Sequence, residues 1–96
     1  MSRRLLFSAE LQADLPDHWT VQGLHIERSY PFVTSSEGVA FALAVAQDAE
    51  RRDYHPELTL RYRGVTVPYW THDRGGVTPL DLQAAARAEA LHQGQV

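Results

Sequence analysis

Two runs of alternating apolar and polar residues constrain the fold of this 96-residue chain more than any other feature. In residues 57–62 every second side chain is apolar, and residues 65–70 repeat the pattern, which has the period of a half-buried β-strand. Only Arg63 and Gly64 separate the two runs, so we predict an antiparallel hairpin that turns at these residues. The chain is therefore expected to build a sheet with one apolar and one polar face.

The predicted turn sets the register of this hairpin and thereby the place of two histidines. If Tyr62 lies opposite Val65, the same register continued outward pairs His55 with His72. Opposed Cβ atoms are about 5 Å apart, so the two imidazoles are expected to share a site on the polar face. Imidazoles exchange protons near neutral pH, which suits acid–base catalysis. The alternative is that both are solvated surface residues without a role.

The rest of the chain predicts three helices and a second hairpin. A short helix is expected to begin at the N-cap Ser8 and to end at Pro16, a hairpin to occupy residues 20–33, and a last helix to begin at Pro79 after the N-cap Thr78. The order α-β-β-α-β-β-α predicts an α+β fold: a four-stranded antiparallel sheet with three helices packed on one face. Residues 1–96 are expected to form a single domain.

The central helix is predicted to begin in residues 34–37, which offer hydroxyl caps and an acidic first-turn residue, and to run to about Asp53. Its buried stripe is expected to contain Val39, Leu43, Ala46 and Glu50, and its solvent-exposed side Asp48, Arg51 and Arg52.

Composition narrows the classes of function. The chain has no cysteine, so it forms neither disulfides nor a thiolate metal site. Its net charge of −3 argues against an electrostatic nucleic-acid binder. The longest apolar run, residues 38–46, is far shorter than the roughly 20 residues that span a bilayer. We expect a cytoplasmic protein without a membrane or nucleic-acid partner.

Two motifs flank the predicted hairpin. The motif before it is Glu50-x-x-x-Tyr54-His55-Pro56-Glu57, and the motif after it is Thr71-His72-Asp73-x-Gly75-Gly76-x-Thr78-x-x-Asp81. Together they resemble the signature of the pterin-4a-carbinolamine dehydratases, which typically have His-His-Pro-Glu-Trp before the hairpin and Thr-His-Asp-x-Gly-Gly-Leu-Thr with a closing Asp after it. This chain departs from that pattern at two positions: Tyr54 replaces the first histidine and Leu58 replaces the tryptophan.

The resemblance implies a dehydratase that converts 4a-hydroxytetrahydropterin to quinonoid dihydropterin in tetrahydrobiopterin recycling, with no metal and no organic cofactor. It implies a homodimer or homotetramer. The implied site consists of catalytic His55 and His72, substrate-binding Tyr54, Glu57 and Asp73, and supporting Glu50, Pro56 and Asp81. Trp70, on the polar face of the predicted sheet, is expected to bind substrate as well, because its ring can stack on a planar heterocycle.

A second function is compatible with the same resemblance. Tyr54 and Leu58 favour a relative with weak or no catalysis, in which the fold serves as a binding or assembly module. Dehydratase-like proteins that assist rubisco assembly are of this kind. A phenol with a pKa near 10 carries protons less well at neutral pH than imidazole does.

Overall fold

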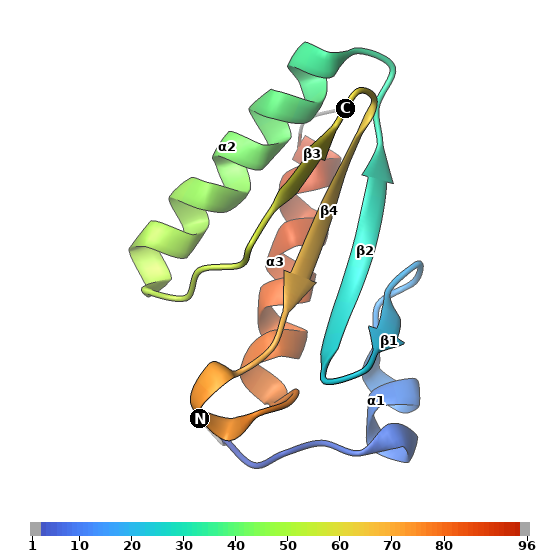
Figure 1. The fold of residues 1–96 in the computed structure, drawn as a ribbon, viewed down its shortest axis with the longest axis vertical. Helices are drawn as coiled ribbons and strands as arrows, with labels where there is room; N and C mark the ends of the chain where they lie inside the picture. Colours follow the sequence, from blue (N-terminus) through green and yellow to red (C-terminus); the bar gives the residue numbers. More distant parts are fainter. Residues whose placement is uncertain (1–2, 95–96) are drawn as a thin grey trace.

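The computed structural model describes residues 3–94, whose elements follow the predicted order (Figure 1). They are α1 (Ser8–Asp14), β1 (Thr20–Gln22), β2 (His25–Pro31), α2 (Ser35–Arg52), β3 (Thr59–Arg61), β4 (Gly64–Tyr69), the 3₁₀ helix η1 (His72–Arg74) and α3 (Pro79–Gly94). The predicted α+β fold with a four-stranded antiparallel sheet is confirmed. Helix α1 begins one residue earlier than expected, because Phe7 and not Ser8 is its N-cap.

The sheet has the strand order β1-β2-β4-β3, and the two long strands β2 and β4 lie at its centre. Their pairing runs from Ile26 opposite Tyr69 to Pro31 opposite Gly64. Strand β3 pairs with β4 only as far as Thr66, so at Pro68 strand β4 has a neighbour on one side alone. This fits a proline, which cannot donate a ladder hydrogen bond.

One face of the sheet carries the core, and α2 and α3 run along it (Figure 1). Alternate side chains of the two central strands point into this core and are buried: Ile26, Tyr30, Val65, Val67 and Tyr69. Leu11 of α1 belongs to the same cluster, so all three helices contribute to one core. Trp19 stacks on Tyr69 beneath the sheet, with ring centroids 5.9 Å apart.

The buried face of α2 differs from the predicted stripe. Phe41 and Val45 are fully buried, whereas Val39 and Leu43 are 54% and 57% exposed. Apolar residues surround this helix on all sides, so their period alone does not select a face. The sheet selects it, because the ring of Phe41 packs against Tyr30 at a centroid distance of 4.6 Å.

Asp48 of α2, expected in solvent, is also buried. Its carboxylate accepts a hydrogen bond of 3.0 Å from the Nε atom of Arg87 in α3. Arg51 and Arg52 remain exposed, as predicted, and their guanidinium groups approach the same carboxylate at 3.8 Å. A buried charge requires such a partner, and here it comes from another helix.

The register of the β3–β4 hairpin is shifted by two residues from the prediction. Leu60 lies opposite Val65, and the turn consists of Tyr62 and Arg63. Two hydrogen bonds from the end of β2 and the start of α2 hold the turn: the amide of Phe32, just after β2, donates to the Arg63 carbonyl at 2.9 Å, and the hydroxyl of Ser35, the first residue of α2, donates to the Tyr62 carbonyl at 2.5 Å. Because β3 begins only at Thr59, His55 and His72 are not cross-strand partners.

Within residues 3–94, none of the helices combines the length and the hydropathy that a membrane span requires.

Candidate active site

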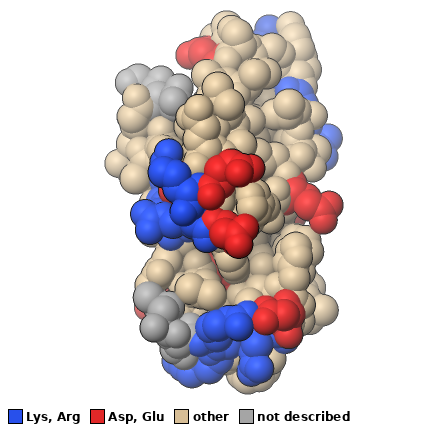
Figure 2. Space-filling view, turned by 90° about the vertical axis from the view of Figure 1, so that its left-hand side faces the viewer, with Lys and Arg blue, Asp and Glu red and all other residues tan. Residues whose placement is uncertain are grey.

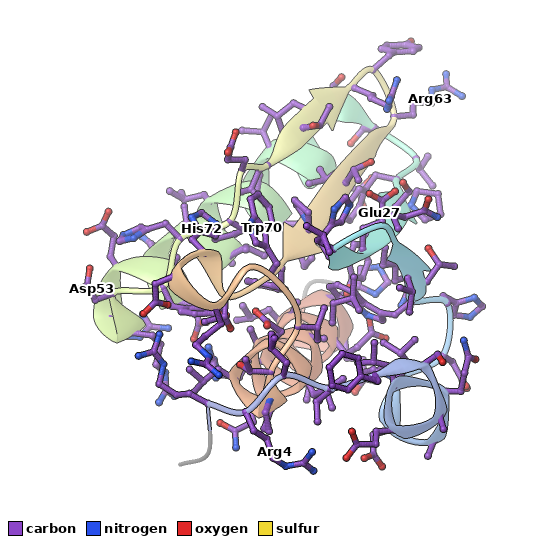
Figure 3. All side chains as sticks on the ribbon, turned by 60° about the horizontal axis from the view of Figure 1, so that its bottom comes forward. Arg4, Glu27, Asp53, Arg63, Trp70 and His72 are labelled. Carbon is purple, nitrogen blue, oxygen red and sulfur yellow. The ribbon has the colours of Figure 1, made fainter. Side chains whose placement is uncertain are left out.

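A pocket of about 490 Å³ lies at the end of β4, a volume in the range of small-molecule sites. It is lined by residues 53–56 after α2, residues 68–73 around the end of β4, and the side chains of Arg3 and Leu80. Figure 3 shows Asp53 on one of these segments and Trp70 and His72 on another. Segments distant in sequence therefore build one site.

The end of α2 builds the first wall of the pocket. Asp53 adopts a left-handed conformation with a φ of 50°, which ends the helix and turns the chain. Pro56 then keeps His55 out of helical geometry. In this position the Nε2 atom of His55 lies 3.5 Å from Glu50 Oε1, and its Nδ1 atom 4.0 Å from Asp53 Oδ1. The imidazole thus has a carboxylate near each nitrogen.

A tight loop after β4 builds the second wall. The Thr71 amide donates to the Gly76 carbonyl at 2.8 Å, and Gly75 supplies the positive φ of 69° that the turn requires. The loop places His72 at the start of η1, where its ring stacks on Trp70 with centroids 4.2 Å apart. Both histidines line the pocket, although strand pairing does not bring them together.

Tyr54 is fixed in the wall by a hydrogen-bond network. Its hydroxyl donates to Asp81 Oδ1 and lies 3.0 Å from the Thr71 hydroxyl. Asp81 is fully buried at the first turn of α3, where its Oδ2 atom accepts from the Thr71 hydroxyl at 2.9 Å and the Thr78 amide at 2.8 Å. The Thr78 hydroxyl in turn accepts from the Leu80 amide at 3.3 Å, so Thr78 caps α3 as predicted.

Burial and the hydrogen bond to Asp81 raise the pKa of Tyr54 far above that of a free phenol. Burial also raises the pKa of Asp81, against the opposing effect of the hydrogen bonds from Tyr54, Thr78 and Thr71. The phenol therefore stays protonated at neutral pH, and its hydroxyl serves to hold the pocket wall against α3.

We expect Tyr54→Phe to lower the free energy of unfolding by about 1–2 kcal/mol, because the buried Asp81 loses one donor and keeps the others. Urea unfolding at neutral pH measures this loss. The matched control is Tyr62→Phe, which removes a hydroxyl from a ring that is 75% exposed. Equal stability of the two variants would contradict a structural role of the Tyr54 hydroxyl.

The pocket contains most of the residues that the motifs predicted. Those that line it are Tyr54, His55, Pro56, Trp70, His72 and Asp73. Glu50 lies at its edge, in contact with His55. Asp81 does not line the pocket, but its carboxylate accepts hydrogen bonds from two residues that do, Tyr54 and Thr71. Glu57 is exposed and does not line the pocket.

Two residues near the pocket were not predicted from the sequence. Arg3 lines the pocket and forms an ion pair with Asp73, 70 positions away. The hydrogen bond and charge of Arg3 lower the pKa of Asp73. The ring of His25 lies 5.7 Å from the Trp70 ring, and its Nε2 atom is 2.8 Å from Glu27 Oε1. No local pattern signals either contact.

The charges near the site are of mixed sign. Figure 2 shows the side of the molecule on which α2 lies, where acidic and basic side chains gather together and uncharged atoms separate the groups. The exposed end of α2 contributes to this mixture with Glu50, Arg51, Arg52 and Asp53. In the described part of the chain, no three His, Asp or Glu side chains converge as metal ligands. Such a surface suits an uncharged, hydrogen-bonding ligand more than a polyanion.

The fold and the pocket define an α+β protein with a pocket lined by two histidines. A profile of the family described as pterin 4 alpha carbinolamine dehydratase matches residues 4–91, and the chain belongs to this family. A Natronomonas pharaonis protein named "Putative pterin-4-alpha-carbinolamine dehydratase" is 43% identical over 91 residues, which cover 95% of this chain and 98% of that protein. A Dechloromonas aromatica protein of the same name is 37% identical over 86% of this chain and 74% of its own length.

Solved structures agree with this assignment. The crystal structure of a transcriptional coactivator/pterin dehydratase from Brucella melitensis has a TM-score of 0.84 and 34% identity, covering 93% of this chain and 99% of that one. A pterin dehydratase-like protein, described as a RuBisCO assembly factor in the alpha-carboxysome, has a TM-score of 0.64 and 19% identity over 77% of this chain and 86% of that one. At that identity, the second structure shares the fold alone.

Proposed function

We propose that this protein dehydrates 4a-hydroxytetrahydropterin to quinonoid dihydropterin, with His55 and His72 as the acid–base pair. The observation that supports the proposal is that both imidazoles line one pocket of about 490 Å³. Membership of the dehydratase family makes a pterin the expected substrate. Both histidine side chains belong to exposed residues, so protons can exchange with solvent between turnovers.

The reaction needs two proton transfers and no redox step. The C4a–O bond breaks as the leaving oxygen takes a proton and departs as water. A ring nitrogen gives up its proton, and the electron pair of that N–H bond enters the new C=N double bond. Two imidazoles on the walls of one pocket, one giving and one taking a proton, can carry out both transfers. The carboxylates of Glu50 and Asp53 lie 3.5 and 4.0 Å from the two nitrogens of the His55 imidazole.

Tyr54 favours a second candidate function, a dehydratase-like binding or assembly module with weak or no catalysis. Its hydroxyl is hydrogen-bonded to Asp81 and Thr71, and its pKa is raised, so it does not carry protons as the family's first histidine can. The two candidates differ in turnover and not in fold.

A direct assay with freshly generated 4a-hydroxytetrahydropterin distinguishes the enzyme from the binding module. We expect wild-type protein to form quinonoid dihydropterin well above the uncatalysed rate, and Tyr54→His to be faster still if a third imidazole assists. Circular dichroism must show that both proteins are folded. Folded protein without turnover in either form would refute the enzyme and leave the binding module.

We also propose that the chain forms a homo-oligomer, as its family implies. Three large apolar side chains on the outer side of α2 and on the edge strand β3 are exposed and support this: Val39, Leu43 and Leu60. Sedimentation equilibrium measures the assembly state, and Leu43→Glu is expected to shift it toward monomer. A strictly monomeric wild type at high concentration would contradict the proposal.

A further inference from the structure

A histidine–carboxylate pair on β2 lies beside the pocket, and the mechanism proposed above does not use it. The Nε2 atom of His25 is 2.8 Å from Glu27 Oε1, and the two side chains are 32% and 31% exposed. Neither residue lines the pocket. The ring of His25 nevertheless lies 5.7 Å from the ring of Trp70, which does line it. Figure 3 shows Trp70 between His72 and Glu27.

Strand pairing places His25 on the same face of the sheet as Trp70. Ile26 lies opposite Tyr69, and both side chains point into the core. The same register continued by one position sets His25 opposite Trp70, with both side chains on the outer face. The backbone of His25 is itself fixed, because this residue begins β2 and pairs with Gln22 of β1. His25 is therefore a firmly held neighbour of the indole.

Trp70 and His72 lie in a less regular part of the backbone. Strand β4 ends at Tyr69, so Trp70 lies just beyond the ladder, and His72 is an exposed residue of η1. The His72 ring stacks on the indole with centroids 4.2 Å apart and planes 26° apart. A change in the direction of the indole therefore moves both imidazole nitrogens of His72. A misplacement of about 1 Å at a reacting group can cost about 10²-fold in rate.

We propose that His25 is a positioning residue, which holds the Trp70 indole in place for His72. Glu27 supports it, because a carboxylate that accepts from one ring nitrogen fixes the orientation of an imidazole. His25 lies outside the pocket, so it acts through Trp70 and does not touch the reacting atoms. The inference rests on the proposed function for the reaction that His72 serves.

NMR spectroscopy of the His72 ring protons tests the contact without any substrate. The ring current of an indole shifts the protons of a stacked imidazole to high field, and at about pH 9 imidazoles are neutral. We expect His25→Ala to move the His72 signals toward those of Trp70→Ala, which lacks the stack. Ser29→Ala is the matched control, because Ser29 lies on the same face of β2 and bonds to Thr66. A merely structural role would lower the stability of His25→Ala and leave these signals unmoved, which would overturn the proposal.

Single-turnover kinetics measures the consequence for the reaction. We expect His25→Ala to be about 5- to 20-fold slower than wild type, and Glu27→Ala to be about two- to fivefold slower. His25→Phe keeps a ring against the indole and should stay within about threefold of the wild-type rate. A rate of His25→Ala equal to that of Ser29→Ala would contradict positioning. His25→Phe as slow as His25→Ala would contradict it too, because the imidazole itself would then be required.

Failure of this inference is separable from failure of the proposed function. His72 signals that move in His25→Ala, in a protein without turnover, would refute the enzyme and retain the positioning. Turnover with unmoved signals would do the reverse. Unmoved signals in a protein without turnover would overturn both.

Discussion

Replacement of His72 by alanine is expected to lower the rate of pterin dehydration about 10²- to 10³-fold, because a positioned acid or base contributes that much to a proton transfer. His55→Ala should cause a loss of similar size. In the double variant we expect the losses not to add fully, because the two imidazoles act on the same substrate. Single-turnover kinetics with freshly generated 4a-hydroxytetrahydropterin measures the chemical step itself.

The matched control for these variants is His18→Asn. His18 is an exposed histidine outside the pocket, and its positive φ of 74° is tolerated by asparagine better than by alanine. We expect this variant to retain the wild-type rate. A rate in His72→Ala within twofold of the wild type, with pterin binding intact, would rule out His72 as a catalytic residue.

Glu89→Gln is expected to lower the free energy of unfolding by about 2–4 kcal/mol. The Glu89 carboxylate of α3 accepts hydrogen bonds from Tyr30, from the Trp19 indole at 3.1 Å, and from Arg28 at 2.6 and 2.7 Å. The Arg28 side chain is only 12% exposed, so the variant leaves its charge without an opposite charge. For a chain of this length the melting temperature should fall by roughly 10–25 °C.

The effect of Glu89 should depend on pH. Burial alone would raise the pKa of Glu89, but the hydrogen bonds from Tyr30, Trp19 and Arg28 together outweigh it, and the pKa lies below its ordinary range. A carboxyl with a lowered pKa stabilises the fold above its unfolded-state pKa and loses that contribution as pH falls. The stability difference between wild type and Glu89→Gln should therefore be largest at neutral pH and shrink toward about pH 3.

Urea unfolding at both pH values measures this dependence. Glu57→Gln makes the same chemical change at an exposed carboxylate and should leave the free energy of unfolding within about 0.5 kcal/mol. A difference for Glu89→Gln that stays constant with pH would contradict the role of its charge.

The sequence predicted the architecture because the patterns behind it are local. Alternation in residues 57–62 and 65–70 marked two strands, the capping residues 34–37 marked the start of α2, and Pro79 marked the start of α3. Most of the candidate site followed from the two motifs, since five of the site residues predicted from them line one pocket together with the predicted Trp70. Proline and glycine residues were local signals of the same kind, because proline restricts the backbone and glycine frees it wherever they occur.

Only the tertiary structure decided which faces and partners these elements use. Residues 39–46 of α2 are all apolar and face every side of the helix, and contact with the sheet determines that Phe41 is buried and Leu43 exposed. Hydrogen bonds from Phe32 and Ser35 hold the turn of the β3–β4 hairpin at Tyr62 and Arg63, one residue before the predicted turn, and the strand register is thereby shifted by two residues.

The composition of the site depends on long-range contacts in the same way. Arg3 is hydrogen-bonded to Asp73, and Tyr54 to Asp81. These partners are 70 and 27 positions apart in the sequence, which is too far for a helix or strand period to predict the contact. By itself the sequence determined where each helix and strand forms and which residues are equipped for proton transfer. Chain folding in three dimensions determined that His55 and His72 share a pocket, because their proximity comes from the end of α2 meeting the loop after β4 and not from strand pairing.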